Sequence, residues 1–356
     1  MKSIKTALCS FGMSGWVFHA PFIYAHPGFT LFGIYERTRQ LSKDKYPGVI
    51  IYRSLEELLA DEQVELVIVN TPNYTHYEFT KKALLANKNV VVEKPFTATS
   101  DEASELIELA KQKGKLITVF HNRRFDSDFK TVQKIVKDGA LGEIVDVEIH
   151  FDRFKEELSP KSHKEIPGAA TGALYDLGSH LIDQALHLFG KPQSVYADIR
   201  IVRPISRVDD YFEVVLYYPN LRVKLKSSYL VREPLPAFIL HGSKGSFIKS
   251  RADVQETSLQ AHKIPGTSDW GIEPETEQGL LHTEIDGKVI RERIPTLQGN
   301  YLDYYEGIFN ALRNNKSVPV PVEDALQVVK TIELAHKSSR ERRVIENQVS
   351  GMRYEV

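Results

Sequence analysis

The chain has 356 residues, of which 42% are hydrophobic and 26% charged, so it has the composition of a globular protein and is too long for one ordinary core. A formal net charge of −1 argues against nucleic acid or an anionic membrane as the main partner. The single cysteine, Cys9, excludes an intrachain disulfide and favours a cytoplasmic location. No run of about eighteen apolar residues predicts a membrane span.

The first part of the chain alternates short apolar runs with amphipathic segments. The runs are rich in Val, Ile, Leu and Phe without clean alternation, which is typical of parallel strands buried on both faces. The expected strands are 4–11, 30–35, 66–70, 90–93 and 116–120. Helices are expected at 54–60, 76–86 and 100–113, with Ser54 and Ser100 as N-caps. This order predicts a doubly wound parallel sheet, a Rossmann domain, over residues 1–122.

The remaining residues, 123–356, have a different pattern. Helices are expected at 128–138, 173–189, 301–312 and 323–340, and strands at 143–151, 195–202, 211–218, 222–230 and 237–241. Pro219-Asn220 predicts a hairpin turn, whereas 155–172 and 250–298 are polar and poorly periodic, so we expect long loops there. These features predict an α+β domain with an open, mostly antiparallel sheet, whose last helix could pack back on the first domain.

A glycine-containing turn follows the first expected strand. The sequence SFGMSG at residues 10–15 is a dinucleotide fingerprint in which Ser10 replaces the first glycine. Gly12 lets the backbone approach a pyrophosphate closely, Gly15 permits tight helix–strand packing, and the next helix directs its N–H groups at the anion. The residues expected to hold the cofactor here are Ser10, Gly12, Met13, Ser14 and Gly15.

The next expected strand ends in an acid, Glu36, at the position where ribose hydroxyls are bound. A carboxylate repels a 2′-phosphate and favours NAD, but Arg37 and Arg39 could pair with that phosphate or lie over the adenine, so NADP stays open. Further cofactor contacts are expected after the strand at 66–70, from Thr71, Pro72, Asn73 and His76.

The strand at 90–93 ends in Glu93-Lys94-Pro95. Ligands of doubly wound folds bind at the carboxyl ends of strands, and the proline keeps Lys94 out of helical geometry. Beside a cationic nicotinamide, the pKa of Lys94 should fall. Glu93 and Lys94 are therefore expected to bind cofactor, and Lys94 to bind substrate, although a surface lysine after a strand is the plain alternative.

The helix expected at 173–189 carries a second set of polar residues. Asp176 and His180 are four residues apart and share a helix face, and Asp183 continues it. A histidine beside a carboxylate can act as a general base. A capping Asp with a core His is the structural alternative, and a metal site is the less favoured one, because no Cys or second His cluster accompanies it.

Other candidates for binding substrate follow strands or lie in loops. His121, Arg123 and Arg124 follow the strand at 116–120, and Arg153 and His163 precede or lie within the loop at 155–172. They could bind substrate hydroxyls or only cap strand ends. The role of His19, in the helix after the glycine turn, is open between facing the cofactor and supporting its site.

These motifs together resemble the Gfo/Idh/MocA oxidoreductase family over nearly the whole chain. The resemblance rests on the glycine turn, on Glu93-Lys94-Pro95 and on the pattern DxGxHxxD at 176–183. The segments 18–21 and 121–128 point to the branch that includes bacterial scyllo-inositol 2-dehydrogenases. The family implies catalytic roles for Lys94, Asp176 and His180, a substrate-binding role for Tyr175, and a dimer or tetramer formed through the C-terminal sheet.

The resemblance implies an NAD(P)-dependent dehydrogenase that interconverts a secondary hydroxyl and a ketone on a cyclitol, a sugar or a sugar derivative, with no metal. Two other activities on this fold stay open: an NAD-dependent glycosidase and a non-catalytic cofactor-binding sensor or co-repressor. A purely structural adaptor is the remaining alternative. The presence of Lys94, Asp176 and His180 favours an enzyme over the sensor or co-repressor.

Overall fold

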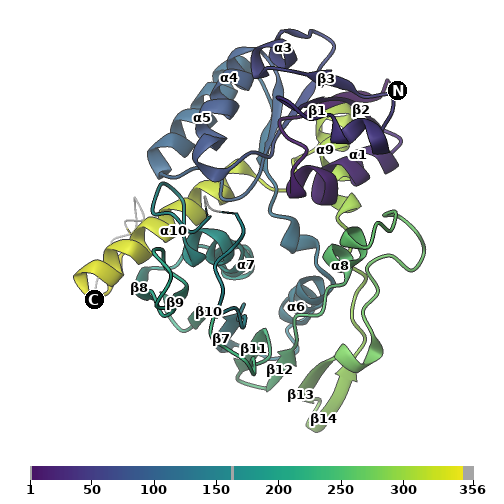
Figure 1. Ribbon diagram of the computed structural model, residues 1–356. Coiled ribbons are helices and arrows are strands. Elements are labelled where there is room, and N and C mark those ends of the chain that lie inside the picture. Colours follow the sequence, from purple (N-terminus) through teal and green to yellow (C-terminus); the bar gives the residue numbers. More distant parts are fainter. Residues whose placement is uncertain (1, 162–163, 348–356) are drawn as a thin grey trace. The chain divides into compact units, whose positions relative to one another are not determined.

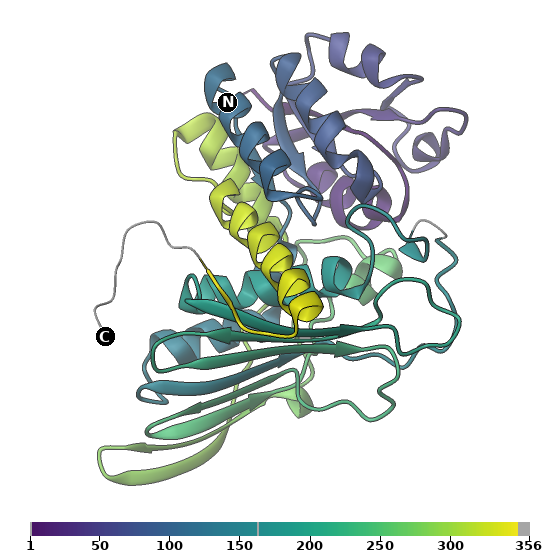
Figure 2. The same cartoon turned by 90° about the vertical axis from the view of Figure 1, so that its left-hand side faces the viewer.

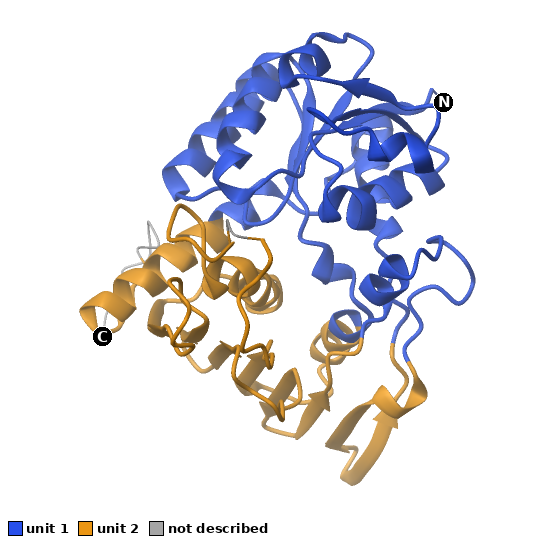
Figure 3. Ribbon diagram, viewed as in Figure 1, with its two compact units in different colours: residues 1–130, 253–273, 297–326 blue, residues 131–252, 274–296, 327–356 orange. Residues whose placement is uncertain are grey.

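The structure is a computed structural model, and it describes residues 2–161 and 164–347. The chain divides into two compact units, and neither is continuous in sequence (Figure 3). Unit 1 contains residues 1–130, 253–273 and 297–326, and unit 2 contains residues 131–252, 274–296 and 327–356. Two later segments of the chain thus belong to the unit that holds the N-terminal fold.

Unit 1 is built on a six-stranded sheet in the order β3-β2-β1-β4-β5-β6, and all its pairings are parallel. Its strands are β1 (Ile4–Leu8), β2 (Phe29–Tyr35), β3 (Ile50–Tyr52), β4 (Leu66–Val69), β5 (Asn89–Val92) and β6 (Ile117–Val119). Every residue of β4 is buried, as expected for a parallel sheet covered on both faces. The predicted Rossmann sheet is confirmed.

Helices cover both faces of this sheet, with α4 and α5 on one side and α1 and α9 on the other (Figure 1). The helices and helical turns of the first part of unit 1 are η1 (Ser14–His19), α1 (Ala20–Ala25), α2 (Leu41–Lys45), α3 (Leu55–Ala60), η2 (Asn73–Thr75), α4 (His76–Leu85), α5 (Ser100–Lys113) and η3 (Asn122–Phe125). The later segments add α8 (Gln255–Gln260), α9 (Leu302–Asn314) and the start of α10 (Val322–Glu341). From α9 and the residue before it, Tyr301, Tyr304 and Tyr305 enter the core with no exposed surface.

The expected helix caps have mixed outcomes. Ser54 caps α3, since its hydroxyl accepts the Glu57 N–H. The expectation that Ser100 caps α5 was wrong by one residue: Thr99 is the N-cap and forms a reciprocal capping box with Glu102. The Glu three residues after Thr99 is the signal that distinguishes the two positions.

Unit 2 is built on a nine-stranded sheet in the order β14-β13-β12-β11-β7-β10-β9-β8-β15. The strands are β7 (Ile144–His150), β8 (Ser194–Arg200), β9 (Tyr211–Tyr217), β10 (Arg222–Ser228), β11 (Phe238–Gly242), β12 (Gly245–Lys249), β13 (Gly279–Ile285), β14 (Lys288–Ile294) and β15 (Ile345–Glu346). Only β7 and β10 pair in parallel. The open, mostly antiparallel sheet is confirmed, with the hairpin turn at Pro219-Asn220 between β9 and β10.

The expectation of long loops over 250–298 was wrong in part. This stretch contains α8, the turn η6 (Glu275–Glu277) and the hairpin β13–β14. Residues 288–294 are rich in charge, so their alternation is weak. Asp286-Gly287 joins them to 279–285 with both φ angles positive, 52° and 75°. An Asp-Gly pair between two such runs is a strong hairpin signal.

The helices of unit 2 lie over one face of its sheet. They are α6 (Ser127–Lys137), which starts in unit 1, the π-helical turn η5 (Leu174–Gly178), α7 (Ser179–Phe189) and most of α10. Figure 2 shows α7 and the end of α10 above the strands. Alternate residues of β9 are fully covered and the others are half-buried, so one face of the sheet is packed and the other is more open. No helix among the described residues is long and apolar enough to cross a membrane.

Candidate active site

The glycine turn at residues 10–15 joins β1 to η1. Gly12 is exposed, and a Cβ placed there would meet only the Ser10 hydroxyl, at 3.9 Å. A Cβ at Gly15 would lie 2.4 Å from the Ser10 carbonyl oxygen. The two glycines therefore differ: Gly15 lets the chain pack on itself, and Gly12 leaves bare backbone open to a ligand. No side chain caps the start of η1, so this end can receive the pyrophosphate of a dinucleotide.

Ser10 closes the turn with three hydrogen bonds to Asn70, one of which, from its hydroxyl, a glycine at this position lacks. Its hydroxyl donates to the Asn70 carbonyl at 2.9 Å. The Asn70 side chain accepts the Ser10 N–H at 3.0 Å and donates to the Ser10 carbonyl at 2.9 Å. Asn70 was predicted only as the end of a strand, although an amide at the carboxyl end of a buried strand is a signal for a site. It ties the ends of β1 and β4 together.

Glu36 has an unexpected environment. Its carboxylate accepts the N–H groups of Leu41 and Ser42, at 3.0 and 3.1 Å, and also the Ser42 hydroxyl. These bonds satisfy N–H groups at the start of α2. Glu36 is buried. Residues 37–39 after it are exposed, so the cationic side chains of this corner, and not the carboxylate, reach the surface.

The residues after β4 are joined to the loop after β5 by a buried histidine. His76 contacts the Pro95 carbonyl oxygen through Nδ1 at 2.7 Å and the Thr71 carbonyl oxygen through Nε2 at 3.0 Å. Burial lowers the pKa of His76. A carbonyl oxygen only accepts, so the neutral ring donates to one of these two oxygens and is held between them. Pro72, next to Thr71, precedes the turn η2 that begins with Asn73.

The carboxylate of Glu93, directly after β5, contacts two elements. Its Oε1 accepts the Ser14 hydroxyl and lies 3.0 Å from His19 Nε2, and its Oε2 accepts the Lys94 N–H at 3.1 Å. Desolvation raises the pKa of Glu93, but His19, Ser14 and Lys94 outweigh it and lower the pKa to about 2. An ionised carboxylate thus joins the glycine turn to the backbone of Lys94. The Lys94-Pro95 peptide bond is cis.

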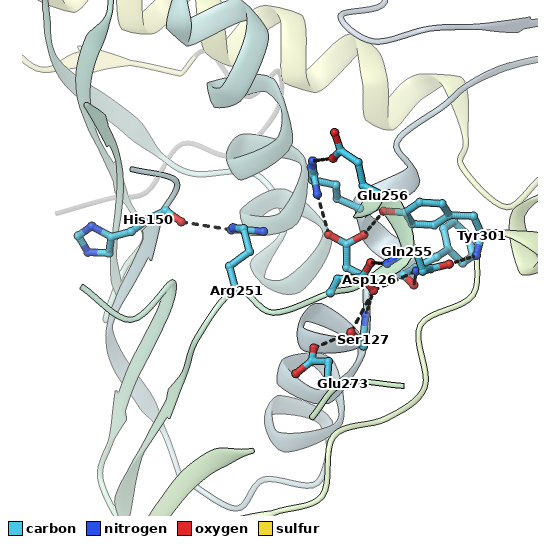
Figure 4. A network of polar contacts seen from close by, with 11 residues as sticks. Asp126, Ser127, His150, Arg251, Gln255, Glu256, Glu273 and Tyr301 are labelled. Atoms are coloured by element: carbon cyan, nitrogen blue, oxygen red, sulfur yellow. Dashed lines mark hydrogen bonds and ion pairs between the residues drawn. The ribbon is translucent and has the colours of Figure 1, made fainter. Parts of the chain in front are cut away.

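The polar residues after β6 pair with other parts of unit 1. Arg123 contacts Asp126 and Glu256, at 3.1 and 3.0 Å, and Arg124 contacts Asp324 at 3.0 Å. Figure 4 shows Asp126 beside Tyr301, whose hydroxyl donates to it at 2.7 Å. Burial raises the pKa of Asp126 well above its usual range. His121, before them, is almost fully buried.

This network continues to the later segments of unit 1. The Ser127 N–H donates to Asp253 and its hydroxyl donates to Glu273, and Gln255 accepts the Tyr301 N–H at 2.8 Å (Figure 4). Arg123 and its neighbours thus hold the segments 253–273 and 297–301 against the Rossmann fold. A substrate-binding role for Arg123 and Arg124 stays a prediction.

In unit 2, Asp176 lies in the π-helical turn η5, and His180 lies in the first turn of α7. The shared helix face of these residues was argued from α-helical spacing, whereas a π turn has i→i+5 bonds. The Asp176 carboxylate accepts the Lys164 ammonium at 2.9 Å. His180 is almost fully buried. The Tyr175 ring stacks on the His336 ring, with the ring centroids 5.6 Å apart.

Lys164 was not predicted as a site residue, and a buried arginine holds the residues around it. Arg203 donates to the Asp210 carboxylate at 2.8 Å and to the Glu157 carbonyl at 2.6 Å. It also contacts Glu165, the residue after Lys164, at 3.3 Å. Arg203 thus anchors the chain at Glu157 and at Glu165. The second anchor lies next to Lys164, which contacts Asp176.

Two further features concern the other predicted site residues of unit 2. Arg153 is exposed, and its guanidinium lies 5.1 Å from the centre of the Phe151 ring. His163 lies outside the described residues. Among the side chains of the described part of the chain, no group of three or more His, Cys, Asp or Glu could hold a metal ion.

The helix that carries Asp176 begins against Asp209. The Asp209 carboxylate accepts the Leu174 N–H at 2.8 Å, and its carbonyl accepts the Ala173 N–H. A Cβ at Gly172, whose φ is +98°, would lie 1.9 Å from Asp209 Oδ1, so only glycine lets Asp209 approach. Burial raises the pKa of Asp209 to about 6.

Two family models match the chain. Residues 4–121 match the oxidoreductase family NAD-binding Rossmann fold, and residues 133–346 match the C-terminal alpha/beta domain of the same Gfo/Idh/MocA family. The chain belongs to the Gfo/Idh/MocA oxidoreductase family. The expected enzyme class, an NAD(P)-dependent oxidoreductase, is confirmed.

Relatives match over almost their whole length. The chain is 38% identical to the scyllo-inositol 2-dehydrogenase (NADP(+)) IolW of Bacillus subtilis, over 97% of this chain and 96% of that protein. It is 39% identical to the uncharacterized oxidoreductase YdgJ of Escherichia coli, over 96% and 97%. Among solved structures, an oxidoreductase from Bacteroides fragilis is 46% identical with a TM-score of 0.90, covering 97% of this chain and 100% of that one.

The raised pKa of Asp209 predicts a pH dependence of stability. The carboxyl has a pKa of 3.8 when unperturbed and about 6 in the fold, so the folded state holds the proton more tightly. Its contribution to stability is complete below about pH 4 and is lost as pH rises through about 6. Asp209→Asn should remove this loss, about 2–3 kcal/mol, in urea unfolding at pH 4 and pH 7.

The matched control is Asp198→Asn, which removes an exposed carboxylate of β8. It should keep the pH dependence of the parent protein. If Asp209→Asn and the parent lose the same stability between the two pH values, Asp209 is not the titrating group.

Proposed function

We propose that this oxidoreductase interconverts a secondary hydroxyl and a ketone on a cyclitol or sugar. The observation that carries the proposal is the bonding of Glu93 to both Ser14 and the Lys94 N–H. These bonds hold the Lys94 backbone beside the glycine turn at residues 10–15, which receives the dinucleotide in this proposal. The name of the relative IolW, an inositol dehydrogenase, supports a polyol as substrate.

In this mechanism the bound nicotinamide cofactor supplies the hydride acceptor, or the hydride in the reverse direction. His180 takes the proton of the substrate hydroxyl as general base. The Lys94 ammonium donates a hydrogen bond to the same oxygen and stabilises the negative charge that develops there. Asp176 orients the substrate. Lys164, which contacts Asp176 at 2.9 Å, holds this carboxylate in place until substrate binds.

The base role of His180 has a direct test. His180→Ala should lower kcat by 10²–10⁴-fold, the usual range for a general base, and leave dinucleotide affinity unchanged. The assay follows absorbance at 340 nm with inositols, aldoses and their keto forms. His187→Ala, on the partly exposed side of the same helix, is the matched control and should keep the parent rate.

Two outcomes would contradict the proposal. Equal kcat in His180→Ala and the parent removes His180 from the reaction. Cleavage of a nitrophenyl glycoside without net change at 340 nm identifies the glycosidase reaction instead.

We further propose that the cofactor is NADP. Both carboxylate oxygens of Glu36 accept N–H groups at the start of α2, so this acid is already engaged and does not need a ribose. Arg37 and Arg39 are exposed next to it and suit a 2′-phosphate. This reverses the preference for NAD that the residue type of Glu36 alone suggests. IolW is named as an NADP(+) enzyme, which supports NADP over NAD as the cofactor.

The cofactor proposal predicts a selective loss of affinity. The double variant Arg37→Ala, Arg39→Ala should bind NADPH about 10–100-fold more weakly, because a hydrogen bond to a charged group contributes about 1.5–3 kcal/mol. NADH affinity, measured by the same fluorescence titration, is the internal control and should stay within about twofold. Equal weakening of both cofactors, or of neither, would contradict the assignment.

Location and assembly complete the proposal. The single buried cysteine suits the cytoplasm, where thiols stay reduced. The half-buried face of β9 is suited to pack on a second copy, as a homodimer or homotetramer formed through the sheet of unit 2. Apart from further copies of the chain, the expected partner is the small-molecule substrate.

A further inference from the structure

A buried histidine that the proposed reaction does not use lies behind Glu93. His19 is the last residue of η1 and has no exposed surface. Its Nε2 lies 3.0 Å from Glu93 Oε1, and its Nδ1 lies 2.7 Å from the Tyr305 hydroxyl of α9. The imidazole ring packs on Phe120, with centroids 4.6 Å apart. His19 therefore has a specific polar partner on each nitrogen inside an apolar wall.

The Tyr305 hydroxyl determines which proton His19 offers to Glu93. This hydroxyl has two acceptors within reach, His19 Nδ1 and the Phe18 carbonyl at 3.3 Å. When it donates to Nδ1, the neutral ring must carry its proton on Nε2, which faces Glu93. In that tautomer, Nε2–H donates to the Glu93 carboxylate.

Both oxygens of Glu93 accept hydrogen bonds from the protein. Its Oε1 receives Ser14 and His19, and its Oε2 receives the Lys94 N–H. The side chain is only 14% exposed. A carboxylate so buried would be driven to its neutral form without hydrogen-bond donors, and the bond from His19 does most to lower the pKa of Glu93.

We propose that His19, set by Tyr305, is a positioning residue that keeps Glu93 as a fixed negative charge, and that this charge favours binding of the oxidised over the reduced cofactor. The inference rests on the proposed function, in which Lys94 faces the nicotinamide. An oxidised nicotinamide ring is cationic and a reduced one is neutral, so the Lys94 ammonium alone would repel the oxidised form. Glu93, one residue away, offsets that repulsion.

The charge is tested with Glu93→Gln, which has nearly the same shape. The affinity for NADP+ should fall about tenfold or more relative to that for NADPH, since one unit charge near the ring is removed. Both dissociation constants are measured by titration of the protein without substrate, so the readout does not depend on activity. A structural loss would weaken the two forms equally.

The role of His19 is tested with three variants. His19→Leu should change the ratio of dissociation constants in the same direction as Glu93→Gln, because the carboxylate loses its imidazole donor and its charged form becomes less stable. His19→Gln can still donate to Glu93 and should restore most of the ratio. His26→Leu is the matched control: His26 also joins the first helical segment to α9, through Glu306 at 2.8 Å, but does not contact Glu93.

The outcomes separate this inference from the proposed function. If the parent protein binds neither NADP nor NAD, the proposed function fails. If the parent binds but His19→Leu has the same NADP+ to NADPH ratio as His26→Leu, the role of His19 is overturned. If Glu93→Gln weakens both forms equally, the role of the charge is overturned.

Discussion

The carboxylate of Glu93 is the interaction on which the cofactor end of unit 1 depends. Burying a charge in a Rossmann core is costly, and it is tolerated only where donors surround it. Here the donors come from the glycine turn through Ser14, from η1 through His19, and from the Lys94 backbone. One charged group therefore sets the positions of two motifs that are almost eighty residues apart in the chain.

Unit 2 also places buried polar side chains behind its candidate motif. Asp209 fixes the start of the helix that carries Asp176 and His180, and Arg203 anchors the loop that presents Lys164. In both units the functional motif coincides with a π-helical turn, Ser14–His19 and Leu174–Gly178. Such turns are rare and occur often at functional sites. They shift side chains from the positions that α-helical spacing predicts.

The sequence predicted the parts of the fold that local physics determines. The parallel strands of unit 1 were visible as continuous apolar runs, and the Ser54 cap was correct. The β13–β14 hairpin was missed because β14 is rich in charge and lies at the edge of the sheet, where alternation is weak. The segments 253–273 and 297–326 were not separable from their neighbours, because their place in unit 1 depends on Tyr301 and Gln255, which contact residues far away in sequence.

The sequence indicated which residues belong to the candidate site, but it did not indicate most of the contacts that those residues make. Glu36 was expected at the ribose because of its place after a strand, but its carboxylate is held by the start of α2. Arg123 and Arg124 looked free for substrate, yet each pairs with a carboxylate of unit 1. Partners such as Asn70, Lys164 and Asp209 carry no motif, because their roles arise only when distant segments meet.

The central claim is that Lys94 and His180 act on the same substrate oxygen. A double-mutant cycle with Lys94→Met and His180→Ala, read as kcat on the best polyol substrate, tests it most directly. Residues that act as a unit are strongly non-additive, so the double variant should be about as slow as the slower single variant. Effects that multiply across the two substitutions would show that the two residues act independently and would contradict the claim.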